Sequence, residues 1–200
     1  MSRIPLQLGV TGGLGAGKSM VCEIFQSLGI PVYNADHRAR WLMENEEELI
    51  EAIKKKFGDK TYSGPKLNRD YLASQVFDNP EKLGALNALV HPRVRVDGKN
   101  WAKTRLDYSY LVREAALMIE SGSYKDMDYL LVVTAPEYIR KQRVLKRDPF
   151  RSPEEVDDIM ASQLSEEEKI KLSDFVLVND GKNLLIPQVL KIHENLSTTH

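Results

Sequence analysis

The strongest chemical signal in the sequence is a glycine-rich run near the N-terminus. It matches the pattern G-x-x-x-x-G-K-[ST] in full, and its members are Gly12, Gly13, Leu14, Gly15, Ala16, Gly17, Lys18 and Ser19. Glycines let a loop aim its backbone N–H groups at phosphate oxygens, the lysine neutralises β- and γ-phosphates, and the serine hydroxyl can ligate Mg²⁺. Chance alone produces this pattern in about 1% of chains of this length. The run therefore predicts binding of a nucleoside triphosphate such as ATP, and leaves the phosphate acceptor open.

Two acidic residues stand where predicted strands end. Asp36 closes the second predicted strand, and Glu114 comes directly after the third. In a parallel sheet both would face the phosphate loop. Asp36 could then accept or orient the proton of an attacking hydroxyl, and Glu114 could reach Mg²⁺ directly or through water. The alternatives are local, because aspartate is a favoured helix N-cap and the helix dipole favours glutamate in a first turn.

A basic stretch could supply a cation for the transferring phosphoryl group. Its six members are Arg140, Lys141, Arg143, Lys146, Arg147 and Arg151. The alternative is a solvated helix face, partly paired with the acids of residues 154–158. The segment Asn179–Lys182 does not have the order of a guanine-reading N-K-x-D motif, and the four histidines show no metal-ligand spacing.

Hydrophobic periodicity predicts the elements that must position these residues. An α/β core is expected, with a parallel sheet because the fourth strand is apolar enough to be buried on both faces. The predicted strands cover residues 4–10, 30–36, 108–113, 129–135 and 174–180, and the predicted helices cover 19–28, a basic segment after Pro136 that ends at Asp148–Pro149, and about 187–196. Residues 197–200 are expected to fray.

The strands divide the chain into expected parts. Residues 1–36, 108–147 and 172–200 form the nucleotide-binding core, residues 37–107 a mostly helical substrate-binding insertion, and residues 148–171 a lid region. A length of 200 residues fits one such chain.

Composition narrows the possible function classes. With 42% hydrophobic and 28% charged residues, disorder and a disulfide scaffold are disfavoured. A net charge of −1 gives no overall positive field for nucleic acid, and the longest apolar stretch, near residues 130–133, is too short to cross a membrane. The single cysteine, Cys22, is predicted to be a small buried residue. Because there is also no leader pattern, the default location is the cytoplasm.

Together these motifs resemble the dephospho-CoA kinase family. The resemblance covers most of the chain. It rests on the segments LGVTGGLGAGKS, LGIPVYNAD with HRAR, LNALVHPRV, the segment ending LMIESG, QRVLKRD, SQLSEEEK and DFVLVNDG. It implies a P-loop kinase fold with a five-stranded parallel sheet flanked by helices, a helical CoA-side insertion and a lid. The implied reaction is in-line transfer of phosphate from ATP, with Mg²⁺, to the ribose 3′-hydroxyl of dephospho-CoA.

The resemblance also implies residue roles. Lys18 and Ser19 serve the phosphates and Mg²⁺, Asp36 activates or orients the hydroxyl, and Arg147 is the lid arginine. Arg40, His91 and Glu114 belong to the substrate side, and Asn179 with Gly181 lies near adenine.

The sequence departs from the family pattern in three places. Asn34 replaces the first carboxylate of the usual D-A-D, Glu114 is one methylene longer than the usual aspartate, and Met20 replaces threonine. Only Asp36 can then be the base. A monomer acting on a small molecule is expected. Another P-loop nucleoside or nucleotide kinase, and a nucleotide-binding regulatory ATPase, remain the alternatives.

Overall fold

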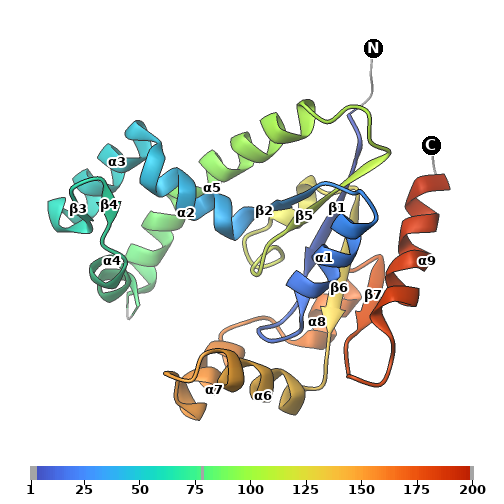
Figure 1. Cartoon of the computed structure of the whole chain (residues 1–200). Coiled ribbons are helices and arrows are strands. Elements are labelled where there is room, and N and C mark those ends of the chain that lie inside the picture. The colour runs from blue at the N-terminus through green and yellow to red at the C-terminus, as the bar shows by residue number, and fades with distance from the viewer. Residues whose placement is uncertain (1–3, 78, 199–200) are drawn as a thin grey trace. The chain divides into compact units, whose positions relative to one another are not determined.

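The computed structural model describes residues 4–77 and 79–198 and divides the chain into two compact units (Figure 1). Unit 1 combines residues 1–34 with 105–200, and unit 2 spans residues 35–104. Unit 2 corresponds to the expected insertion of residues 37–107. It begins two residues earlier, at residue 35, and ends three residues earlier, at residue 104. Of the four residues expected to fray, 197 and 198 belong to the last helix, and 199–200 lie outside the described residues.

Unit 1 is built on a five-stranded parallel sheet. Its strands are β1 (Leu6–Thr11), β2 (Val32–Asn34), β5 (Tyr110–Glu114), β6 (Tyr129–Thr134) and β7 (Phe175–Val178), in the spatial order β2-β5-β1-β6-β7. Every neighbouring pair runs parallel. The predicted sheet is thus confirmed, and the carboxyl ends of its strands share one edge, where ligands of open α/β sheets bind.

The central strand β6 shows how side-chain alternation builds two cores. Leu131 and Val133 belong to the cluster that packs against helices α1 (Lys18–Ser27) and α9 (Leu185–Thr198). Leu130 and Val132 point to the opposite face, where they join the cluster around Met118. A strand covered on both faces reads as a continuous apolar run, which is why the sequence YLLVVT predicts its buried position.

Three further helices of unit 1 follow β6 and carry the basic stretch and the expected lid region. They are α6 (Glu137–Arg147), α7 (Pro153–Ala161) and α8 (Glu166–Lys171). Helix α6 ends at Arg147 with Asp148 as its C-cap, as predicted. Both α7 and α8 begin with a capping box, formed by Ser152 with Glu155 and by Ser165 with Glu168. These caps satisfy the first backbone N–H groups of two short helices. A short 3-10 helix, η2 (Ser123–Asp126), precedes β6.

Unit 2 is mostly helical and has its own core. It comprises α2 (Ala35–Asn45), α3 (Glu47–Phe57), the 3-10 helix η1 (Asp59–Thr61), α4 (Arg69–Val76) and α5 (Pro80–Lys103), together with the small hairpin β3 (Tyr62–Ser63) and β4 (Lys66–Leu67). Leu49, Ile53 and Phe57 of α3 are at the centre of this core. An ion pair of 2.7 Å between Arg38 and Asp97 ties α2 to α5. Over residues 4–77 and 79–198, no helix has the length and apolar character that crossing a membrane requires.

Candidate active site

The phosphate loop joins β1 to α1 in a conformation that requires glycine. Gly12, Gly15 and Gly17 all have positive φ, at 152°, 78° and 95°. A Cβ atom on Gly12 would lie 2.1 Å from the carbonyl oxygen of Val133, and one on Gly17 would lie 2.2 Å from Nδ2 of Asn179. Both neighbours are held in place by other bonds, so neither position can accept a larger residue without moving the loop.

Helix α1 presents an N-terminus suited to an anion. Its N-cap is Gly17, which has no side chain to cap the first N–H groups, and its first turn consists of Lys18, Ser19 and Met20. The uncapped N–H groups and the helix dipole favour a negatively charged ligand there. The Lys18 ammonium donates to the carbonyl oxygen of Gly12 at 2.9 Å and to that of Gly13 at 3.5 Å. The lysine therefore lies across the loop, and the hydroxyl-bearing Ser19 is exposed beside it.

Asn179 braces this loop from the end of β7. Its Nδ2 donates to the carbonyl oxygen of Ala16 at 2.8 Å, and its backbone N–H donates to that of Thr134 at 2.8 Å. Its Oδ1 accepts from Nη2 of Arg143 at 3.2 Å. The side chain is 7% exposed. A direct structural role of Asn179, which sequence reasoning did not predict, is thus to hold the loop; its neighbour Gly181 is exposed and has a φ of 79°.

Glu114 occupies the strand end next to the phosphate loop. It is the last residue of β5, is paired in register with Val10 of β1, and is 5% exposed. Residue 115 has no regular structure and residues 116–122 form turns, so the alternative of a glutamate in a first helical turn is wrong. The carboxylate accepts a hydrogen bond from Nδ2 of Asn34. Glu114 is expected directly after the strand and is found one residue earlier, as the last residue of β5; its chemical role stays a prediction.

The single cysteine, Cys22, lies in helix α1, one turn after the phosphate loop. Cys22 is 5% exposed, and burial raises the pKa of its thiol; the Glu114 carboxylate raises it further, while the Lys18 ammonium lowers it. The thiol stays protonated at neutral pH, which agrees with the predicted small buried residue. Glu114 is paired with Val10, the residue before Thr11 at the end of β1, so its strand ends next to the start of the phosphate loop.

Three predicted residues of the substrate side lie in unit 2. Asp36 is in the first turn of α2, because β2 ends at Asn34 and the helix begins at Ala35. It is therefore neither the end of a strand nor an N-cap, and both predicted placements are wrong by one or two residues. Arg40 follows at the i+4 position, so the two exposed side chains share one face of α2. Desolvation lowers the pKa of the His91 imidazole, and the negative charge of the Asp36 carboxylate opposes this shift.

The basic stretch places Arg140, and not Arg147, against the phosphate loop. Arg147 is 62% exposed and forms hydrogen bonds of 3.0 and 2.7 Å with its neighbour Asp148, which lower the pKa of that carboxyl group. Arg140 is 6% exposed and extends toward the carbonyl oxygen of Leu14. The composition of the stretch gave no means of choosing between its six cations. The role of Arg147 as a lid arginine stays a prediction.

The glycine requirement at the start of the loop leads to a testable expectation. Gly12→Ala should force the loop away from Val133, lower stability by about 1–3 kcal/mol and weaken ATP binding at least about tenfold. Calorimetric titration with ATP and thermal unfolding would measure both effects. Gly84→Ala is the matched control, because its added Cβ meets no atom within 4 Å and helix α5 favours alanine. Unchanged ATP affinity in Gly12→Ala would contradict the expectation.

The loop, the strand order and the positions of Lys18 and Asn179 define a P-loop nucleotide-binding protein. A family model described as dephospho-CoA kinase matches residues 6–184. A dephospho-CoA kinase of Chlorobium chlorochromatii is 39% identical over 203 residues, which cover 98% of this chain and 95% of the relative. The chain belongs to the dephospho-CoA kinase family.

Solved structures agree with this assignment. The crystal structure of TT1252 from Thermus thermophilus matches with a TM-score of 0.86 and 36% identity, covering 96% of this chain and 98% of that one. A dephospho-CoA kinase from Campylobacter jejuni matches with a TM-score of 0.71 and 27% identity over the same shares. The P-loop kinase fold expected from the sequence is therefore confirmed.

Proposed function

We propose that the protein transfers the γ-phosphate of ATP to the ribose 3′-hydroxyl of dephospho-CoA, giving CoA and ADP. The observation that carries the proposal is a complete phosphate loop, crossed by the Lys18 ammonium, in a chain of this family. The P–O bond to the acceptor forms as the bond to the ADP oxygen breaks, and the hydroxyl proton is lost from the acceptor. The protein then contributes mainly positioning and electrostatic stabilisation.

We assign the donor side to unit 1. Loop N–H groups and Lys18 bind the phosphates, and the Asn179 brace, with its 2.8 Å bond to Ala16, keeps those N–H groups oriented. Glycines at three positive-φ positions support this role, because they let the backbone approach the phosphates closely. Arg147 would add a cation to the transferring group when the segment of residues 148–171 acts as a lid.

We assign the acceptor side to the first turn of α2 and its neighbours. Asp36 accepts or orients the proton of the 3′-hydroxyl, and Arg40, one turn later, binds an anionic part of the substrate. The lowered pKa of His91 favours a neutral imidazole at pH 7, which can both donate and accept hydrogen bonds to the substrate.

Mg²⁺ fits the donor side through oxygen ligands. The exposed Ser19 hydroxyl at the start of α1 is a suitable first ligand, and the buried Glu114 carboxylate next to the loop is suited to bind a metal-bound water. Within the described residues, no three acidic, histidine or cysteine side chains gather into a metal site. Mg²⁺ characteristically takes one or two protein ligands and fills the rest with phosphate oxygens and water. When bound, it neutralises charge on the β- and γ-phosphates.

The proposal extends to a monomer that works on a small molecule in the cytoplasm. It is supported by a net charge of −1, which gives no general attraction for nucleic acid, and by a single cysteine that forms no internal disulfide.

The test is ADP release by the purified protein with Mg-ATP, in the presence and absence of dephospho-CoA. We expect ADP formation that depends on dephospho-CoA, and a product whose mass is that of the acceptor plus one phosphoryl group. Turnover with a nucleoside or nucleotide instead would favour the other P-loop kinases. Hydrolysis at a rate indifferent to every acceptor would favour a regulatory ATPase and contradict the proposal.

A further inference from the structure

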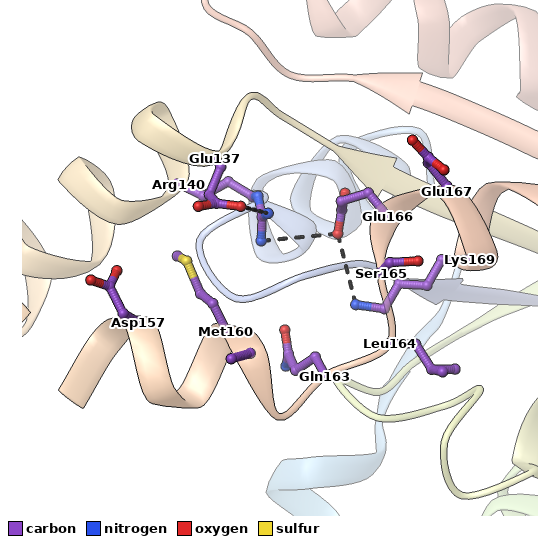
Figure 2. A pocket seen from close by; sticks show the side chains of 11 residues that line it. Glu137, Arg140, Asp157, Met160, Gln163, Leu164, Ser165, Glu166, Glu167 and Lys169 are labelled. Atoms are coloured by element: carbon purple, nitrogen blue, oxygen red, sulfur yellow. Dashed lines mark ion pairs between the residues drawn. The ribbon is translucent and has the colours of Figure 1, made fainter. Parts of the chain in front are cut away.

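A cavity of about 600 Å³ lies in unit 1, and two residues that line it, Arg140 and Gln163, form hydrogen bonds with Leu14 of the phosphate loop. Side chains from α6, α7 and α8 and from the segment that joins α7 to α8 line it. Figure 2 shows ion pairs that link Arg140, Glu166 and Lys169 inside it. Arg140 belongs to α6, and Glu166 and Lys169 belong to α8. We call these three residues the α8 triad. None of them was singled out by the phosphate-loop motif, and the mechanism above does not use them.

Arg140 contacts the loop with both its backbone and its guanidinium group. Its Nη1 reaches the carbonyl oxygen of Leu14 at 3.5 Å and lies 2.5 Å from where a Cβ on Gly13 would stand. Its own carbonyl oxygen lies 2.4 Å from the corresponding position on Gly15. A further bond of 3.1 Å, from Nε to the carbonyl oxygen of Ala135, fixes the side chain. This cation therefore lies directly against the segment that binds phosphate.

Leu14 is held on its other side by the segment between α7 and α8. Its backbone N–H donates to Oε1 of Gln163 at 2.9 Å. With Arg140 at its carbonyl oxygen, the two polar backbone atoms of Leu14 contact side chains from outside the loop. The orientations of the two peptide units that flank Leu14 are thus set by α6 and by the segment between α7 and α8.

Glu166 is the member of the triad that connects these contacts. Its Oε2 accepts from Oγ1 of Thr134 at 2.7 Å, at the end of β6. Its Oε1 lies 3.9 Å from Nη1 of Arg140 and 3.7 Å from Nζ of Lys169. The Lys169 side chain is 1% exposed, and its other anionic partner is Glu120, at 3.8 Å. One carboxylate thus stands between two buried cations, where the low dielectric strengthens each interaction.

We propose that Glu166 is a positioning residue for the nucleotide phosphates and that it acts through Arg140. The inference rests on the proposed function, in which those phosphates bind the loop. Without Glu166, the anionic partner left to Arg140 is Glu137, which is 77% exposed and 4.0 Å away. The guanidinium group would then be drawn toward solvent, because an unpaired buried charge is costly. The loop would lose both a nearby cation and the support of Leu14.

The first test compares Glu166→Gln with Glu167→Gln. Glu167 is an exposed neighbour on the same helix, and its side chain points away from the triad in Figure 2. For Glu166→Gln we expect the KM for ATP to rise about tenfold, within the range for coupled neighbours, with the KM for dephospho-CoA within about twofold of wild type. Glu167→Gln should leave both unchanged. A KM for ATP within twofold of wild type in folded Glu166→Gln would overturn the inference.

A double-mutant cycle tests the route through Arg140. If Glu166 acts through Arg140, the variant carrying both Glu166→Gln and Arg140→Gln should have the same KM for ATP as Arg140→Gln alone. Effects that multiply instead would show that the two residues act independently, and would overturn the proposed route.

A milder variant keeps the test valid if Glu166→Gln fails to fold. Thr134→Val removes the 2.7 Å bond to Glu166 without changing any charge, and should raise the KM for ATP about two- to fivefold at an unchanged KM for dephospho-CoA. An unchanged KM for ATP in folded Thr134→Val would count against the inference. Wild-type protein without dephospho-CoA kinase activity would instead refute the proposed function, and calorimetric titration with ATP would still test Glu166.

Discussion

Lys18→Ala should reduce turnover at least about a thousandfold, because it removes the cation that crosses the phosphate loop. The ammonium lies 2.9 Å from the Gly12 carbonyl oxygen and is the nearest positive charge that the loop motif itself provides. As phosphate leaves ADP, negative charge builds on the bridging and non-bridging oxygens, and a fixed cation there stabilises the transition state more than the ground state. Steady-state ADP release with saturating dephospho-CoA measures the effect.

The control for this loss is Lys191→Ala. Lys191 is an exposed lysine on α9, so the substitution also removes one positive charge from unit 1. We expect its kcat within twofold of wild type. Lys18→Ala should still fold, since its side chain contributes no core packing, and a thermal unfolding curve would verify this. Retention of more than a tenth of wild-type kcat in Lys18→Ala would refute the role assigned to the lysine.

Asp36→Asn should lower kcat by about a hundredfold or more while changing the KM for dephospho-CoA little, because asparagine cannot accept the hydroxyl proton. The amide keeps nearly the same shape and can still form hydrogen bonds to the substrate. The effect should therefore fall on the chemical step. Single-turnover measurements with excess enzyme would separate that step from product release.

Asp70→Asn is the matched control for the local role of Asp36. Asp70 is an exposed acid in the first turn of α4 within the same unit, so its substitution makes the same change in the favourable interaction with a helix dipole. Near wild-type kcat is expected for Asp70→Asn. If Asp36→Asn behaved in the same way, Asp36 would be a helix-stabilising acid and not the base.

The phosphate loop and the central strands could be predicted from sequence because their signals are local. The loop needs glycine at positive φ, and β6 needs apolar side chains on both faces. The edge strand β2 is harder, because it pairs with β5 alone over three residues. A signal that short does not fix where the strand ends, so the sequence predicts a strand that reaches Asp36, whereas the structure has Asp36 in the first turn of α2.

Two other features depended on tertiary contacts. The hairpin formed by β3 and β4 is only two residues long on each side, around a turn in which Gly64 has a φ of 61°. From the sequence, this segment is expected only to belong to the mostly helical insertion of residues 37–107. Which cation of α6 turns inward depends on how that helix docks on the phosphate loop, so Arg140 could not be distinguished from Arg147 by its residue type.

The burial of Cys22 has a practical consequence for spectroscopy. Thiol reagents attack the thiolate, and a single cysteine that is 5% exposed with a raised pKa presents almost none of it. Maleimide or nitroxide probes would therefore attach selectively to a cysteine introduced at an exposed position, such as Ser162→Cys between α7 and α8. The mobility and environment of the expected lid could then be followed at that one probe in the otherwise native chain, without first removing its natural thiol.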